Sequence, residues 1–222
     1  TLAEVFKAAG YATASIGKWH LGPETHWPQS QGFDVNIAGT DLGSPTSGYF
    51  APWKIPTIDE GANGDYLTDR MGHEAANYVK ANAAKPFFLY LPHFAVHTPI
   101  QGPADLVAKY EKLVRPGARH TNPKYAAMVE SMDTAIGRVI TALEEARILD
   151  RTVIVFTSDN GGHLPTTSNV PLRVGKGSCY EGGTRVPLIV RWPGGAAAGS
   201  VSDVPVITPD LYPTLLAITG VP

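Results

Sequence analysis

The ten residues from Val153 to Gly162, with the sequence VIVFTSDNGG, constrain the fold of this chain most strongly. Four apolar residues, three of them β-branched, predict a short strand that is buried on both faces. The run then changes at once into polar residues that include Asp159 and Asn160, followed by two glycines. Because ligands of parallel sheets bind at the carboxyl ends of the strands, this position favours a binding site.

Asp159 and Asn160 allow two interpretations. A carboxylate beside a carboxamide offers two hard oxygen ligands, which suit Ca²⁺ or Mg²⁺ better than a metal that prefers sulfur. The other interpretation is an ordinary surface turn, because Asn160-Gly161 is a favoured turn pair. Taken alone the stretch favours the turn, and the other motifs of the chain reverse that preference.

Composition limits the class of protein. A chain of 222 residues, 43% hydrophobic and 17% charged, predicts one globular domain or most of one. The net charge of −2 argues against a nucleic-acid partner, and the single cysteine excludes an internal disulfide. No apolar run approaches the ~20 residues that a membrane span needs. The chain opens at Thr1 directly on a helical pattern, so we expect a piece of a longer protein and leave its localisation open.

Helical periodicity alternates with strand-like runs along the sequence. We expect strands at residues 11–16, 87–91, 152–156 and 186–192, and helices at residues 2–9, 66–83, 123–143 and 211–218. A loop with a short helix fills the stretch that ends at Arg119. Asn122 is suited to cap the longest helix, with Pro123 in its first turn. This order predicts an α/β sandwich with a mainly parallel central sheet flanked by helices.

Residues 23–64 are rich in glycine, proline, serine and asparagine and show no lasting period. A stretch of this length predicts a long functional loop on the substrate side, without regular elements. Its aromatic residues Trp27, Tyr49, Phe50 and Trp53 could stack on a sugar ring, or they could pack the loop itself. The sequence leaves both interpretations open.

Polar clusters follow three of the predicted strands and precede a fourth. Lys18 and His20 follow the first strand, His97 follows the second, and Lys176 lies before the last. If the strands lie side by side in one parallel sheet, these side chains meet Asp159 at one edge. Ammonium groups and a hard cation would there neutralise charge on a tetrahedral oxyanion ester, while a histidine protonates the leaving oxygen. Sulfate and phosphate monoesters are the substrates that this chemistry serves.

Each of these residues also has an ordinary interpretation. A single lysine is more often a solvated surface charge, and Lys18 with His20 could belong to a half-buried strand. His93 could line the loop wall, so we prefer His97. Cys179 has no basic partner beside it in the sequence, which favours a packing role. We expect the remaining histidines at the surface: His26, His73, His120 and His163.

In this order and spacing, the motifs resemble those of the sulfatase family, within the alkaline-phosphatase-like superfamily. The likeness spans nearly all 222 residues and is carried by five motifs: residues 10–22, residues 86–91 with His97-Thr98-Pro99, residues 157–162, Gly175-Lys176-Gly177 with residues 180–185, and residues 210–216.

The resemblance implies an alkaline-phosphatase-like sandwich in which residues 1–222 form the central part of the sulfatase catalytic domain. It implies that Asp159 and Asn160 are two of the ligands of a Ca²⁺ ion. It also implies a formylglycine nucleophile, which such enzymes make from cysteine or serine in a Cys/Ser-x-Pro-x-Arg motif. The substrate would be a sulfated small molecule or saccharide.

The catalytic roles that the resemblance implies fall on four residues. Lys18 and His20 would contact the aldehyde hydrate of the nucleophile, with His20 as a base that helps to expel sulfate from the covalent intermediate. His97 and Lys176 would hold the substrate sulfate and assist departure of the alcohol oxygen.

The Cys/Ser-x-Pro-x-Arg motif is not found in these 222 residues, nor is the paired acidic motif that completes the family's metal site. In the family both precede the position matching Thr1, so we expect a fragment, which also lacks the C-terminal subdomain. We expect residues 1–222 alone to bind Ca²⁺ weakly, because Ca²⁺ takes six to eight oxygens, and to be inactive. We expect the complete protein, from which this fragment comes, to hydrolyse sulfate monoesters, preferably of a carbohydrate.

Two other functions stay open. A phosphatase or phosphodiesterase of the same superfamily would usually hold two metal ions, whereas here lysines take the place of a second cation. A non-catalytic protein that binds anions or sugars would keep the cluster without turnover.

Overall fold

The computed structural model describes residues 1–222 and contains five strands in two sheets. β1 (Ala12–Ile16) lies between β2 (Val35–Ile37) and β3 (Phe87–Tyr90), and both pairings are parallel. Ala14 is aligned with Val35 on one side and with Leu89 on the other. β4 (Ile154–Thr157) and β5 (Leu188–Arg191) form a separate antiparallel pair.

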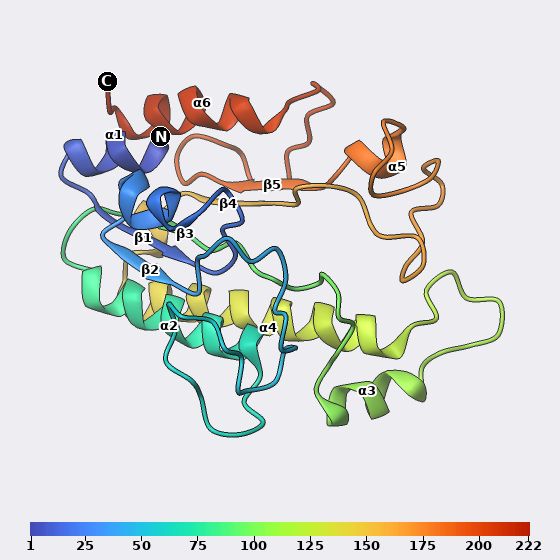
Figure 1. Cartoon of the computed structure of the whole chain (residues 1–222). Coiled ribbons are helices and arrows are strands. Elements are labelled where there is room, and N and C mark those ends of the chain that lie inside the picture. The colour runs from blue at the N-terminus through green and yellow to red at the C-terminus, as the bar shows by residue number, and fades with distance from the viewer.

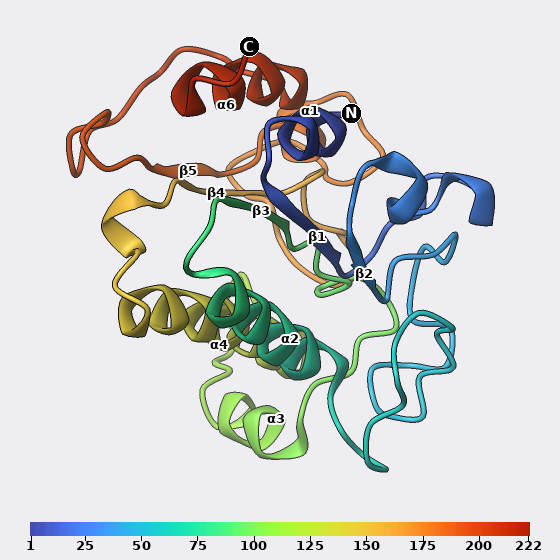
Figure 2. The ribbon, with the colours of Figure 1, turned by 90° about the vertical axis from the view of Figure 1, so that its left-hand side faces the viewer.

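Helices cover both faces of the strand layer, as Figures 1 and 2 show. α2 and α4 lie on one face, and α1 and α6 lie on the other. The arrangement is the predicted α/β sandwich. The helices are α1 (Leu2–Ala8), α2 (Leu67–Asn82), α3 (Ala104–Glu111), α4 (Pro123–Glu145), α5 (Glu181–Thr184) and α6 (Leu211–Thr219), with 3₁₀ turns η1 (Glu24–His26), η2 (Pro28–Gln31), η3 (Leu149–Arg151) and η4 (Thr208–Asp210).

The helices begin where their sequences offer caps. Thr1 and Glu4 form a capping box at the start of α1, which satisfies amide groups that have no partner in the first turn. The Asn122 side chain accepts a hydrogen bond from the Tyr125 amide at 3.1 Å, and Pro123 occupies the first turn of α4. The predicted cap of the longest helix is therefore confirmed.

α2 and α4 pack closely because Gly72 has no side chain. A Cβ atom at Gly72 would lie 2.7 Å from the Cβ of Ala135 on α4. Further along the two helices, Val79 of α2 and Ala142 of α4 are both fully or almost fully buried in one apolar cluster. Each helix leads into a strand, so this contact fixes β3 and β4 over the same helical layer.

The aromatic residues of the long loop are part of the core. Trp53 and Tyr49 are completely buried, and the Trp53 indole donates a hydrogen bond to the Tyr49 carbonyl at 2.9 Å. Tyr49 also stacks on Tyr66, with 5.7 Å between ring centroids. Of the two interpretations of these aromatics, packing is therefore correct for Tyr49 and Trp53, and neither ring is available to a sugar.

Three sequence-based expectations about the strands are wrong. Residues 23–64 do contain a regular strand, β2, whose three residues are too few to show a period but complete the edge of β1. The last strand runs antiparallel to β4 instead of joining a parallel sheet. β4 is only half-buried and not covered on both faces, and β5 is mostly exposed.

No helix in the structure has both the length and the apolar character needed to cross a membrane.

The close approach of α2 and α4 can be tested with two glycine substitutions. Gly72→Ala should lower the free energy of unfolding by about 1–3 kcal/mol, because the added methyl group overlaps Ala135. Gly137→Ala on α4 is the matched control: nothing lies within 4 Å of its Cβ position. At that position the better helix propensity of alanine should raise the free energy of unfolding by up to about 1 kcal/mol. Urea unfolding measures both, and equal effects would contradict this packing.

Candidate active site

The residues after β1 are held from both sides by the chain that follows β2 and β3. The Lys18 amide donates to the Pro92 carbonyl at 2.7 Å, and the His20 amide donates to the Thr40 carbonyl at 2.8 Å. Gly17 has a φ of 133°, and a Cβ there would overlap the Pro92 carbonyl, so only glycine fits. Lys18 is half-buried, whereas His20 is exposed.

The His20 ring lies against the loop that follows β2. A Cβ at Gly43 would lie 2.7 Å from the His20 Cε1 atom, so the ring and the Gly43 backbone are in contact. His20 itself has a φ of 55°, in the left-handed region that side chains rarely adopt. This backbone strain fixes the direction in which the side chain leaves the loop.

The turn that carries His97 is held by the buried Tyr49. The Tyr49 hydroxyl lies 2.7 Å from the Phe94 carbonyl and 3.0 Å from the His97 carbonyl, and it donates to this pair. Burial raises the pKa of Tyr49 well above its ordinary value, so the hydroxyl keeps its proton. Tyr49 is a supporting residue that the sequence did not identify, because only tertiary packing brings it beneath residues 94–97.

Asp159 and Asn160 follow β4, as predicted, and Lys176 lies in the loop between β4 and β5. The Lys176 amide donates to the Gly162 carbonyl at 3.1 Å, so the two segments are directly joined. Because β5 runs antiparallel to β4, the residues before β5 return to the carboxyl end of β4. In Figure 1 the chain leaves β3 and β4 toward the same side of the molecule.

Electrostatics links three of the predicted site residues. Partial burial lowers the pKa of Lys18, and the nearby Lys176 ammonium group lowers it further. The Asp159 carboxylate acts in the opposite direction and raises the pKa of Lys18. The charges of Lys18, Asp159 and Lys176 therefore interact, although they come from three separate segments. His20 instead contacts Thr40 and Gly43 of the loop after β2. His97 contacts Tyr49 and its neighbour Thr98.

The predicted metal site consists of two side chains that offer oxygen ligands. Asn160 accepts a hydrogen bond at its backbone carbonyl, from the Ser158 hydroxyl at 2.9 Å, so the side-chain oxygens of Asp159 and Asn160 are available to a cation. No group of three or more His, Cys, Asp or Glu residues is gathered in a way that could hold a metal ion. The two residues fit a hard cation such as Ca²⁺ as partial ligands, and the remaining oxygens must come from elsewhere.

Two further residues near the loops, His93 and Cys179, have environments that the structure makes clear. Both ring nitrogens of His93 are buried without a hydrogen-bond partner, and burial lowers the pKa of His93 to about 4. The His93 ring is thus neutral, with its nitrogens buried in a residue that is half-buried overall. Cys179 is exposed, so the packing role expected for it is wrong. The other histidines lie at the surface as predicted: His26, His73, His120 and His163.

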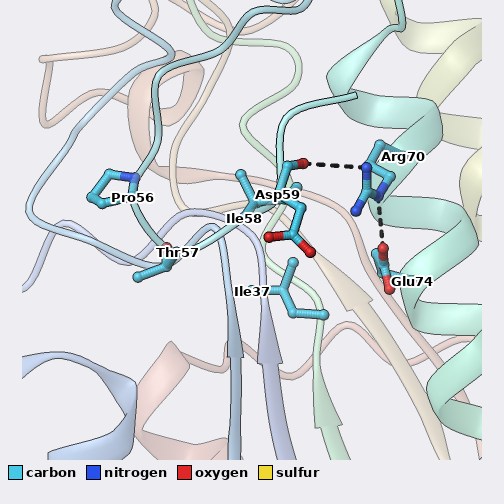
Figure 3. A pocket seen from close by; sticks show the side chains of 7 residues that line it. All are labelled: Ile37, Pro56, Thr57, Ile58, Asp59, Arg70 and Glu74. Atoms are coloured by element: carbon cyan, nitrogen blue, oxygen red, sulfur yellow. Dashed lines mark hydrogen bonds and ion pairs between the residues drawn. The ribbon is translucent and has the colours of Figure 1, made fainter. Parts of the chain in front are cut away.

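A hollow lies beside the start of α2 and is shown in Figure 3. Arg70 on its wall pairs with Glu74 at 2.6 Å and donates to the Asp59 carbonyl at 3.3 Å. Its cation is therefore already neutralised, and none of the predicted site residues line it. We do not assign the chemistry to this hollow.

The fold and the cluster together define an α/β protein with interacting charges at one edge of its strand layer. Lys18 follows β1, Asp159 and Asn160 follow β4, and Lys176 is joined to the segment after β4 through the Gly162 carbonyl. Such a group of charges can hold a tetrahedral oxyanion and stabilise the negative charge that develops on it.

Comparison with known proteins agrees with this class. The sulfatase family model matches residues 1–221. A protein named Sulfatase from Formosa agariphila is 35% identical over 272 residues, covering 98% of this chain and 49% of that protein. N-acetylgalactosamine-6-sulfatase from Homo sapiens is 32% identical, covering 99% of this chain and 44% of that enzyme.

A solved structure is similar to this chain over its whole length. The crystal structure of Ps i-CgsB in complex with k-i-k-neocarrahexaose has a TM-score of 0.85 at 33% identity, covering 100% of this chain and 53% of that chain. The chain belongs to the sulfatase family, and it spans about half the length of the curated relatives it matches.

The electrostatic link between the three segments predicts opposite pKa changes at Lys18. In metal-free protein, Asp159→Asn should lower the pKa of Lys18 further, because it removes the only charge that raises it. Lys176→Met should raise the pKa of Lys18. NMR titration of labelled lysine side chains measures both changes, with Lys85→Met at an exposed position as the control. Absence of both changes would show that the segments do not face one another.

Buried His93 predicts a loss of stability in acid. Its folded pKa of about 4 lies below the ordinary value of 6.5, so the unfolded chain binds more protons in this window. The free energy of unfolding should therefore fall as the pH drops from about 6.5 to about 4, by up to about 1.4 kcal/mol per pH unit. His93→Phe should flatten this dependence, whereas His73→Phe, at an exposed histidine of α2, should leave it unchanged. Urea unfolding at several pH values measures the difference.

Proposed function

We propose that the complete protein containing this chain is a sulfuric ester hydrolase that cleaves sulfate monoesters. The observation that carries the proposal is the interaction of the Lys18, Lys176 and Asp159 charges at one edge of the strand layer, in a chain of the sulfatase family. Sulfate monoesters carry a single negative charge on a tetrahedral group, and ammonium groups match that charge without a second metal ion. This is the reason to prefer sulfate over phosphate esters.

The residues of the chain have different roles in this reaction. Lys18 and Lys176 hold the non-bridging oxygens of the sulfate and stabilise charge as the ester bond breaks. His97, with Lys176, delivers a proton or hydrogen bond to the departing alcohol oxygen, which an imidazole can do near neutral pH. His20, held in its left-handed backbone conformation against Gly43, acts as a base next to Lys18.

Asp159 and Asn160 would supply two oxygens to a Ca²⁺ ion, which when bound adds positive charge beside the sulfate. The remaining oxygens and the formylglycine nucleophile belong to the complete protein. The same reasoning implies that residues 1–222 alone bind Ca²⁺ weakly and hydrolyse no sulfate ester.

The substrate class that we propose is a sulfated carbohydrate. The support is that one relative is named N-acetylgalactosamine-6-sulfatase, and that the solved structure of Ps i-CgsB contains k-i-k-neocarrahexaose. In the chain itself, the buried Tyr49 and Trp53 contribute no sugar-stacking surface. Contacts with the sugar must therefore come from other residues.

One assay of the complete protein tests both the reaction and the substrate class. Sulfated oligosaccharides should have higher kcat/KM values than an aryl sulfate, a steroid sulfate or the matching phosphate monoesters. Lys18→Ala or Lys176→Ala should lower kcat about 10²–10³-fold, because each removes a group that stabilises developing charge. Lys85→Ala, an exposed lysine before β3 at the opposite end of the strand, is the matched control and should change nothing.

A faster reaction with phosphate monoesters would replace the proposal by a phosphatase. Binding of sulfated saccharides without any turnover would replace it by a non-catalytic binding function.

A further inference from the structure

The loop between β4 and β5 is unusual because its backbone segments touch one another directly. A Cβ at Gly161 would overlap the Gly182 carbonyl, and a Cβ at Gly175 would overlap the Gly162 carbonyl. The Gly161 amide donates to the Gly183 carbonyl at 2.9 Å. The segment after β4 is thus in direct backbone contact with the segment that carries Lys176.

Apolar packing contributes little to this loop. Leu164, Val170 and Val174 are exposed by 52%, 56% and 38% of their surface. Because no buried apolar side chain fixes these segments, their separation depends on a few hydrogen bonds and on the close glycine contacts.

One side chain, Asn169, lies at the centre of these contacts. Its Nδ2 donates to the Gly162 carbonyl at 2.8 Å, and its Oδ1 accepts from the Gly162 amide at 3.0 Å. The same Nδ2 would lie 2.6 Å from a Cβ at Gly175, so the carboxamide packs against both segments. The Gly162 carbonyl also accepts from the Lys176 amide, which makes Gly162 the junction of the network.

We propose that Asn169 is a positioning residue. It sets the distance between the segment that carries Asp159 and Asn160 and the segment that carries Lys176. A carboxamide is required because Gly162 presents an amide donor and a carbonyl acceptor to the same side chain. Asn169 touches no substrate atom; it acts through the two segments that carry the site residues. The role in catalysis rests on the function proposed above, because a misplacement of about 1 Å in such a site can lower the rate about 10²-fold.

The test uses three variants of the complete protein. Asn169→Ala removes both hydrogen bonds to Gly162, and kcat for sulfate ester hydrolysis should fall about 10–100-fold with a smaller change in KM. Ser168→Ala, the neighbouring control, removes only a 3.3 Å bond from the Val170 amide and should leave kcat unchanged.

Asn169→Asp gives a readout that loss of stability alone would not produce. Its carboxylate would face the Gly162 carbonyl without a proton to donate, whereas the protonated acid restores one donor and one acceptor. The ratio of its kcat to that of the wild type should therefore rise as the pH is lowered from 8 to 5. A ratio that does not change with pH would contradict the positioning role.

Hydrogen exchange separates failure of this proposal from failure of the proposed function. In Asn169→Ala the amides of Gly161 and Lys176 should exchange at least about tenfold faster, while amides of β1 and α4 keep their protection. If the wild type hydrolyses no sulfate ester, this exchange result still decides whether Asn169 holds the two segments together. Unchanged exchange together with unchanged kcat would overturn the proposal.

Discussion

The structure depends on hydrogen bonds that continue beyond the end of β1 on both of its sides. The Gly17 amide donates to the carbonyl of the last residue of β2, the Lys18 amide to a carbonyl just after β3, and the His20 amide to a carbonyl after β2. A central strand would otherwise end in a free loop, because loops have few partners for their backbone groups. Here the pairing carries Lys18 and His20 past the sheet edge in a defined direction, and it ties their loop to the turn of His97 through the chain after Pro92.

The site combines this rigid half with a second half that has almost no apolar core. Lys18 follows directly on buried residues of the central strand, and its own partial burial lowers its pKa. Asp159 and Lys176 lie in the loop between β4, which is half-buried, and β5, which is mostly exposed. Glycine contacts and Asn169 hold the segments of this loop together. Charges alone could not fix the distance between the halves, because exposed charges interact weakly in water. Backbone geometry must therefore do so.

Much of the fold and of the candidate site could be predicted from local sequence. The cap at Asn122 and the apolar stripe of α4 are local features, and the strands before His97 and Asp159 end close to where their polar residues begin. β2 could not be predicted, because three residues contain no measurable period and exist as a strand only beside β1. Tyr49 shows the same limit: an aromatic residue in a polar loop does not reveal whether it faces solvent or supports a turn.

The sequence by itself determined which chemical groups are available: two lysines, two histidines and two side chains with hard oxygen donors, each in a loop that joins a strand. It also determined the family, because the order and spacing of motifs are properties of the chain alone. Only the tertiary structure decided that β5 returns antiparallel to β4, which brings Lys176 back to Asp159, and that Asn169 joins their segments. The physical reason is that these contacts link residues far apart in the chain through backbone groups, which are the same in every residue and leave little trace in the sequence.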